Sequence, residues 1–193
     1  MKRRVVIVGA GALGSHVALF LRNEAVDLRV IDDDRVESKN TLAQVHTRQG
    51  LGRNKAMALQ QTLNGLWGVK IDAVPSRLGD TNAWTLLDGA GLVLDCTDNI
   101  ATRKGIAHYV TVAGIPCLHG ALSADGTFGR IVWEPWFTPD AEGAPGQATC
   151  EGGEHLPFFA LVGAQMAVIV QEFLATGVQR SVQVTPGGVV RLV

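Results

Sequence analysis

Three glycines near the start of the chain have the spacing of a phosphate-binding turn. Gly9, Gly11 and Gly14 follow a run of four β-branched residues and fit the pattern G-x-G-x-x-G. In such a turn the first glycine permits the tight bend, the second lets a ligand approach the backbone, and the third lets a helix pack on a strand. The N–H groups at the start of the following helix can then bind phosphate. The pattern fits NAD, FAD and ATP sites alike, so it predicts a nucleotide without identifying it.

Two charged side chains beyond the glycines are suited to other parts of a nucleotide. Asp32 opens an acidic triplet at the end of a second apolar run, about 20 residues past the glycines, where a carboxylate binds ribose hydroxyls. A polar turn at the end of a strand is the alternative. Lys55 falls in the first turn of a predicted helix, where a cation opposes the helix dipole, and this suggests an anion nearby. A solvated lysine would give the same pattern.

A further carboxylate, Asp98, lies in the segment LVLDCTDN at positions 92–99. The segment ends a buried strand and places Asp95 and Asp98 three residues apart. Ligands bind at the carboxyl ends of parallel strands in doubly wound sheets. Asp98 is therefore suited to hold a magnesium ion through oxygen ligands. Its alternative role is to cap the helix that begins near Asn99.

The elements that must position these residues alternate between strand and helix. Apolar runs predict strands at 5–8, 28–31, 69–74 and 92–94, and periodicity predicts helices at 10–21, 54–63, 81–87 and 99–112. A polar loop is expected over residues 35–53. This alternation predicts a parallel sheet with crossover helices.

The last third of the chain changes character. A strand at 117–122 is followed by the hairpin signal Asp125-Gly126 and an antiparallel strand at 127–133. A surface crossover rich in Pro, Gly and acidic residues is expected over 134–154, then an apolar helix at 157–174 and a hairpin at 181–193 that turns at 186–188. The fold class is α/β: a Rossmann-like, mainly parallel sheet extended by antiparallel C-terminal strands, in a single domain over 1–193.

Composition excludes several classes of protein. The chain has 193 residues, 47% of them hydrophobic, and a net charge of −1. Because no basic stripe is present, nucleic acid and anionic membranes are not expected as partners. The longest apolar runs are far short of the ~20 residues that span a bilayer, and Met1 leads directly into a core strand rather than a signal peptide. A cytoplasmic protein is expected.

The order and spacing of the motifs resemble the ThiF/MoeB/HesA family, the bacterial relatives of ubiquitin-activating enzymes. The matching segments are VVIVGAGALGS, the Asp32 triplet followed by Asn40, LGRNK ending at Lys55, LVLDCTDN with Arg103 beyond it, and LVGAQMAVIVQEFL near the C-terminus. The resemblance runs through nearly the whole chain. It implies an adenylyltransferase that uses ATP and Mg²⁺ to activate the C-terminal carboxylate of a ubiquitin-like or sulfur-carrier protein, or of a peptide, as an acyl-adenylate.

The resemblance also assigns roles to individual residues. Asp32 would bind the ribose, Asn40 and Lys55 the phosphates, and Asp98 the magnesium ion, while the three glycines would lie under the nucleotide. A carboxylate that attacks the α-phosphate brings two anions together, so such a site must place compensating positive charge. The family further implies a homodimer.

Two departures from the family pattern leave alternatives open. The family usually places an arginine three residues after the asparagine, and this position is Ala43. Arg48 or Arg53 could replace it. Otherwise the chain is a non-catalytic relative that binds nucleotide or carrier protein as one subunit of a heterodimer, an alternative also favoured by the lack of an N-terminal arm. An NAD(P)-dependent oxidoreductase, supported only by the glycines and Asp32, is the remaining alternative.

Three cysteines are scattered along the sequence. With no C-x-x-C pair among them, neither a disulfide framework nor a structural zinc site is expected. Cys96 and Cys117 border strands and are interpreted as small buried apolar residues. Cys150 lies in the crossover, roughly where family members carry a catalytic cysteine, and could accept an acyl group or persulfide with His155 nearby. An inert loop cysteine is the alternative.

Overall fold

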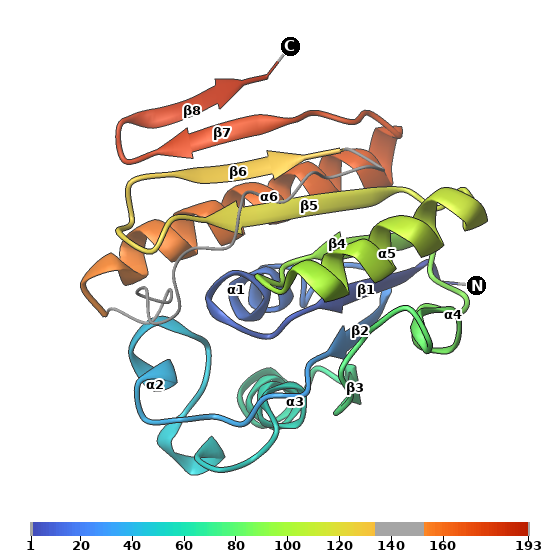
Figure 1. The fold of residues 1–193 in the computed structure, drawn as a ribbon. Helices are drawn as coiled ribbons and strands as arrows, with labels where there is room; N and C mark the ends of the chain where they lie inside the picture. Colours follow the sequence, from blue (N-terminus) through green and yellow to red (C-terminus); the bar gives the residue numbers. More distant parts are fainter. Residues whose placement is uncertain (1, 134–152, 193) are drawn as a thin grey trace.

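The computed structural model describes residues 2–133 and 153–192, and it contains one eight-stranded sheet in the order β3-β2-β1-β4-β5-β6-β7-β8. The five strands that pair in parallel are β1 (Arg4–Val8), β2 (Asp27–Ile31), β3 (Asp72–Val74), β4 (Leu92–Asp95) and β5 (Cys117–Leu122). The antiparallel extension is formed by β6 (Gly129–Val132), β7 (Val182–Thr185) and β8 (Gly188–Arg191) (Figure 1). The predicted fold class is confirmed.

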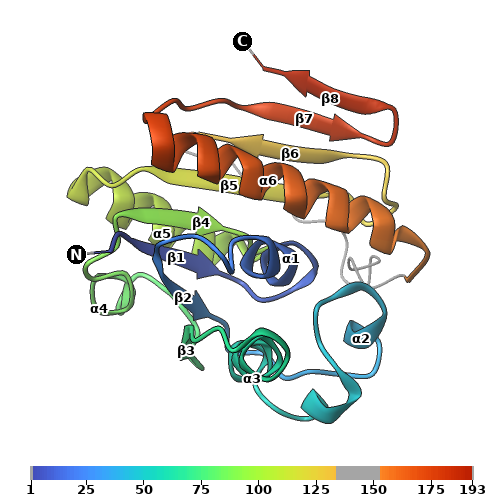
Figure 2. The ribbon, with the colours of Figure 1, turned by 180° about the vertical axis from the view of Figure 1, so that it is seen from behind.

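Helices cover both faces of the parallel strands. The longer ones are α1 (Ala12–Phe20), α3 (Lys55–Trp67), α5 (Ile100–Ala113) and α6 (Leu156–Thr176), and the shorter ones are α2 (Asn40–Ala43), α4 (Ala83–Leu86) and the 3-10 turns η1 (Arg48–Gly50) and η2 (Gly153–His155). Figures 1 and 2 place α1 and α6 on one face and α5 on the other. Both layers are needed because β1 is apolar on both of its faces.

The alternation of side chains along β1 divides the core into two clusters. Val5 and Ile7 belong to the cluster under α1, α3 and α6, whereas Val6 and Val8 belong to the cluster under α4 and α5. All four side chains are buried. Successive side chains of a strand point to opposite faces, so a continuous β-branched run fills both layers and fixes the central strand.

The apolar helix near the C-terminus is longer than the sequence suggested. An 18-residue stretch within Gly153–Thr176 has a mean hydropathy of 1.7, and this helical segment is thus long and apolar enough to cross a membrane by length and composition. The expectation that no segment reaches that length is therefore wrong. However, Val162, Met166 and Val170 are completely buried, and α6 packs along α1 (Figure 2). This burial is typical of a core helix.

The segment around α3 differs from the sequence prediction. The helix extends to Trp67 and ends at Gly68, whose φ of +68° is typical of a left-handed helix cap. The predicted strand at 69–74 begins only at Asp72, because the Val69 N–H still bonds to the carbonyl of Leu63. The last turn was missed because Leu66 and Trp67 are exposed and so break the apolar period. The expected loop at 35–53 also contains α2 and η1.

Candidate active site

The glycine turn lies where β1 ends and α1 begins, beside the carboxyl end of β4. Gly9 has a φ of +95°, and a Cβ there would lie 2.8 Å from the carbonyl oxygen of Cys96. A Cβ on Gly14 would collide with the Gly9 carbonyl, whereas a Cβ on Gly11 would meet nothing within 4 Å. The three glycines thus have the geometry expected of a tight turn, of an open approach and of close packing between helix and strand.

Asp32 directly follows β2, and its carboxylate contacts the glycine turn. One carboxylate oxygen accepts the N–H of Ala10 at 2.6 Å, and the other accepts the N–H of Asp34 at 2.8 Å. Burial raises the pKa of Asp32, against the lowering effect of the Ala10 N–H and of the nearby Lys55 charge. The structure therefore joins Asp32 to the glycine turn, and its role as a ribose ligand stays a prediction.

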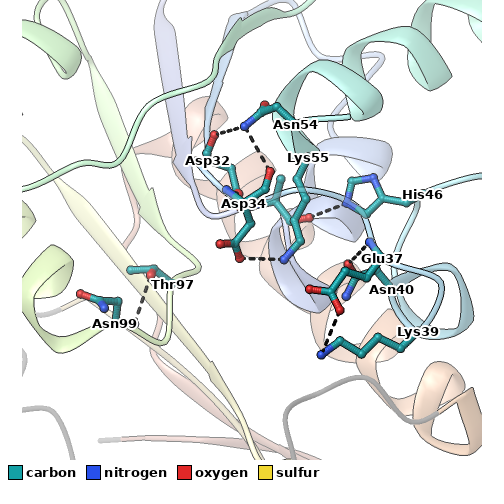
Figure 3. A network of polar contacts seen from close by, with 11 residues as sticks. Asp32, Asp34, Glu37, Lys39, Asn40, His46, Asn54, Lys55, Thr97 and Asn99 are labelled. Carbon is teal, nitrogen blue, oxygen red and sulfur yellow. Dashed lines mark hydrogen bonds and ion pairs between the residues drawn. The ribbon is translucent and has the colours of Figure 1, made fainter. Parts of the chain in front are cut away.

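Lys55 lies at the start of α3 and faces the same acidic segment. Its Nζ is 2.9 Å from a carboxylate oxygen of Asp34, and its backbone N–H donates to the Asp34 carbonyl at 2.8 Å. Asn54 caps α3 and also donates to the carbonyl of Asp32 at 2.7 Å (Figure 3). The anion that the helix dipole suggested near Lys55 is therefore present within the chain: it is Asp34.

The exposures of the two partners differ. The Lys55 side chain is only 11% exposed, whereas that of Asp34 is 67% exposed. The ammonium group is thus held in place by its surroundings, while its carboxylate partner remains in solvent. An incoming anion could replace Asp34 at little cost in free energy, since exposed ion pairs contribute little to stability.

Asn40 begins α2 and is 2% exposed. Its Oδ1 accepts the N–H of Glu37 at 2.8 Å, which fixes the amide within the segment 37–40 (Figure 3). Ala43, three residues later, is completely buried in the main core cluster. The position at which the resemblance implies an arginine is therefore packed against the core in this chain.

The two replacement arginines have different surroundings. Arg53 is exposed and donates from its guanidinium to Gln61 Oε1 at 2.6 Å. Arg48 is exposed on η1, and its side chain makes no hydrogen bond or ion pair with the residues that the structure describes. Arg48 is therefore the less constrained of the two.

A histidine that the sequence reasoning missed lies under the glycine turn. His46 is 5% exposed, and its Nε2 lies 2.8 Å from the carbonyl oxygen of Ala10. Burial lowers the pKa of His46 to about 4, so the ring is neutral near pH 7. The position is in the polar loop that follows the acidic triplet, and only its proximity in the fold reveals the contact.

Asp98 extends from the loop after β4, next to the glycine turn. It is exposed and makes no hydrogen bond or ion pair among the described residues. The cap of α5 is Asn99, whose side chain accepts the Thr102 N–H at 2.9 Å, so the alternative role of Asp98 as a cap is wrong. This loop packs directly against Gly9, because the space that a Cβ of residue 9 would occupy is filled by the backbone of Cys96 and Thr97.

Buried charges fix the start of the same loop. Asp95 is completely buried, accepts the Thr97 N–H at 3.1 Å and lies 2.9 Å from Nδ1 of the buried His119. Arg103 Nε donates to the Thr97 carbonyl at 2.7 Å. The peptide groups of Thr97 are therefore held on both sides, and this fixes the backbone that presents Asp98. In the sequence, Asp95 and Arg103 stand out only as parts of motifs, and no pattern indicates His119.

The three cysteines divide as follows. Cys117 is buried and Cys96 is partly buried, and burial raises the pKa of both thiols well above the ordinary value. The interpretation of both as apolar core residues agrees with these positions. Cys150, the candidate nucleophile, lies outside the described residues.

The chain is similar to proteins of known families. A model of the ThiF family matches residues 1–176. The adenylyltransferase and sulfurtransferase UBA4 of Debaryomyces hansenii is 32% identical over 179 residues, which are 86% of this chain and 40% of that protein. The sulfur carrier protein adenylyltransferase of Thermus thermophilus is 38% identical over 123 residues, with coverages of 61% and 45%. The chain thus spans less than half the length of these curated relatives.

Solved structures agree on the fold. The crystal structure of E. coli MccB with ATP matches with a TM-score of 0.77 and 16% identity, and the match covers 98% of this chain and 62% of that one. At this identity the match establishes the fold alone. The antiparallel strands after β5 are included, since nearly all of the present chain is covered.

Proposed function

The chain belongs to the ThiF family, and on this premise we propose that it binds ATP with Mg²⁺ and adenylates a carboxylate. The single observation that carries the proposal is the convergence of three groups at the carboxyl ends of β1 and β2. These groups are the open turn at Gly11, the Asp32 carboxylate beneath it, and the Lys55 ammonium held by an exposed partner. Together they supply the backbone donors, the ribose acceptor and the phosphate cation that a nucleoside triphosphate needs.

Asp98 suits magnesium better than the acidic triplet does. The carboxylates of residues 32–34 lie within 4.8 Å of one another, but Asp32 accepts two backbone N–H groups and Asp34 is paired with Lys55. Asp98 is exposed and has no partner among the described residues. Mg²⁺ is usually held by one or two carboxylates together with substrate phosphates. When bound, the ion would neutralise charge on the phosphates.

The residues of the chain would bind and orient the reactants. An oxygen of the substrate carboxylate forms a bond to the α-phosphorus, and the bond to the β-phosphate oxygen breaks, so that pyrophosphate leaves. The Lys55 ammonium group would exchange its ion pair with Asp34 for one with a phosphate oxygen, and it would thereby offset the charge of the two approaching anions. Asn40, fixed by Glu37, would donate its amide N–H to a phosphate. Asp32 would hold the ribose hydroxyls.

The proposed substrate is the C-terminal carboxylate of a small sulfur-carrier or ubiquitin-like protein, or of a peptide. The names of the two curated relatives support this class, since both are called adenylyltransferases and one is named for a sulfur carrier. We expect the protein to act in the cytoplasm and as a homodimer, with no nucleic acid partner. A role for Cys150 in accepting the activated acyl group remains part of this proposal.

Exchange of labelled pyrophosphate into ATP tests the activity. The chain is incubated with ATP, Mg²⁺ and a panel of carrier proteins, each also prepared with its C-terminal carboxylate converted to an amide. Exchange is expected with a free carboxylate and absent with the matching amide, because only the carboxylate can attack the α-phosphorus. Absence of exchange with every carrier, together with measurable ATP binding, would contradict the enzymatic proposal.

The second candidate function is a nucleotide-binding subunit without turnover. It is favoured by the burial of Ala43, which leaves Lys55 as the cation whose position beside the turn is established. Exchange by the parent distinguishes the two functions, and Arg48→Ala, with Arg53→Ala as the matched control, then tests whether Arg48 supplies the missing charge. If Arg48 supplies the missing charge, its removal lowers exchange at least tenfold, whereas the Arg53 variant stays close to the parent. Titration with ATP and with NAD by calorimetry tests the oxidoreductase alternative.

A further inference from the structure

Both backbone polar groups of Ala10 are held by side chains of different segments. Its N–H donates to Asp32 at 2.6 Å, and its carbonyl oxygen lies 2.8 Å from Nε2 of His46. The loop that carries His46 is also tied to α1, because the Val45 N–H donates to the Ser15 hydroxyl at 3.0 Å. The segment that begins at Asn40 is thus attached through His46 to the glycine turn and through Val45 to α1.

The direction of the Ala10 carbonyl determines the direction of the next N–H. In a trans peptide the carbonyl and the following N–H point to opposite sides. Since His46 holds the Ala10 carbonyl toward the protein interior, the N–H of Gly11 points away from His46. No hydrogen bond from this N–H is found within the described residues, and the space beside Gly11 is open.

We propose that His46 is a positioning residue of the nucleotide site: its Nε2–H fixes the Ala10 carbonyl and thereby aims the Gly11 N–H at the phosphates of the ligand. The inference rests on the proposed function only in taking a nucleotide as that ligand. His46 does not touch the nucleotide. It transmits the position of the loop at 40–46 to the turn that does.

The contacts of His46 also specify its tautomer. A carbonyl oxygen only accepts, so Nε2 must carry the proton. Nδ1 is buried without a partner among the described residues, and a second proton there would have no acceptor. The Lys55 charge lies near the ring and opposes a positive charge on it, and a proton on the neighbouring His16 would have the same effect. The functional form is therefore the neutral Nε2–H imidazole.

Two substitutions of similar size separate the hydrogen bond from the packing. His46→Gln can place an N–H donor close to the position of Nε2, whereas His46→Leu fills the space without a donor. Calorimetric affinities for ATP and for adenosine are measured for the parent and both variants. His46→Leu is expected to weaken the binding of ATP about tenfold and that of adenosine less than about twofold, because only the phosphates accept a hydrogen bond from the Gly11 N–H. Glutamine is expected to restore ATP binding to within about threefold of the parent.

Equal weakening of ATP and adenosine in His46→Leu would overturn the inference, since a merely structural role lowers both. Unchanged ATP affinity would also overturn it. If the leucine variant does not fold, ¹⁵N NMR of the parent decides: a ring at pH 7 with the proton on Nδ1, or on both nitrogens, contradicts the proposal. These results are independent of turnover, because exchange can be absent while the His46 variants still change the ratio of ATP to adenosine affinity.

Discussion

Replacing Lys55 by methionine should abolish catalysis while leaving the fold nearly unchanged. Methionine keeps an unbranched stem in a position where the lysine side chain is only 11% exposed, so the packing at the start of α3 is preserved. The lost ion pair is with a carboxylate that is 67% exposed and therefore screened by solvent, and we expect its loss to cost about 1 kcal/mol. For a chain of this length the melting temperature should fall by about 2–4 °C.

The effect of the same substitution on the reaction should be much larger. Removing a preorganised charge that acts where anionic charge develops costs about 100-fold or more in rate. Pyrophosphate exchange in Lys55→Met is therefore expected to fall at least about 100-fold relative to the parent. Thermal unfolding of the same preparation measures the stability separately.

Asp34→Asn is the matched control, because it removes the same ion pair but keeps the ammonium group. We expect this variant to retain exchange and to unfold at least as easily as Lys55→Met, because it leaves a largely buried ammonium group without its carboxylate partner. Two results would refute the reasoning: exchange that persists in the methionine variant, or a methionine variant that unfolds several kcal/mol more easily than the asparagine variant.

Three further predictions concern the turn, the metal and pH. Gly14→Ala places a Cβ against the Gly9 carbonyl and should lower the free energy of unfolding by roughly 3 kcal/mol in denaturant titrations. Gly11→Ala, where the space beside the Cα is open, should lower it by less than about 1 kcal/mol. Similar losses in both variants would contradict the packing argument. Asp98→Asn should raise the Mg²⁺ concentration for half-maximal exchange about tenfold without weakening metal-free ATP binding, because it removes a metal ligand and a negative charge together. An unaltered Mg²⁺ dependence would exclude Asp98 as the ligand. The pKa of His46 is about 4 in the folded state and 6.5 in the unfolded chain, so only the unfolded chain gains a proton between these values, and stability falls as the pH is lowered. The free energy of unfolding of the parent should therefore be about 2 kcal/mol lower at pH 4.5 than at pH 7, and His46→Gln should lack this part of the loss. An equal loss in both proteins would reject the assignment.

Local patterns in the sequence were sufficient for the parallel part of the fold. The β-branched run of β1 and the three glycines define a strand, a turn and a helix with little dependence on the rest of the chain, and the structure has them there. The hairpin at Asp125 was equally local: the Ser123 N–H bonds to the Phe128 carbonyl across it. Such features are predictable because each residue type has a single conformational reason to be present.

Other features depended on contacts between distant segments. The side chain of Ala43 is buried by the fold of α2 onto the core, and no pattern in the loop at 35–53 shows which side chains face inward. The link between His46 and Ala10 joins positions 36 residues apart. The capping role of Asn99 rather than Asp98 required the dihedral angles of the loop. Tertiary contacts determine these details, and a single sequence does not encode them in any local period.

The charge balance of the site supports a nucleotide that arrives with its metal. The carboxylates of Asp32, Asp33 and Asp34 adjoin the turn, and Asp98 extends from the neighbouring loop, whereas Lys55 is the cation whose place among them is established. A nucleoside triphosphate alone would add several negative charges to a region that is already negative, and its binding would be opposed. A divalent cation carried by the phosphates reverses this balance, because it gives Asp98 a partner and lets Lys55 exchange Asp34 for phosphate at little cost. ATP should therefore bind this chain much more tightly with Mg²⁺ than without it, and the difference should shrink in Asp98→Asn.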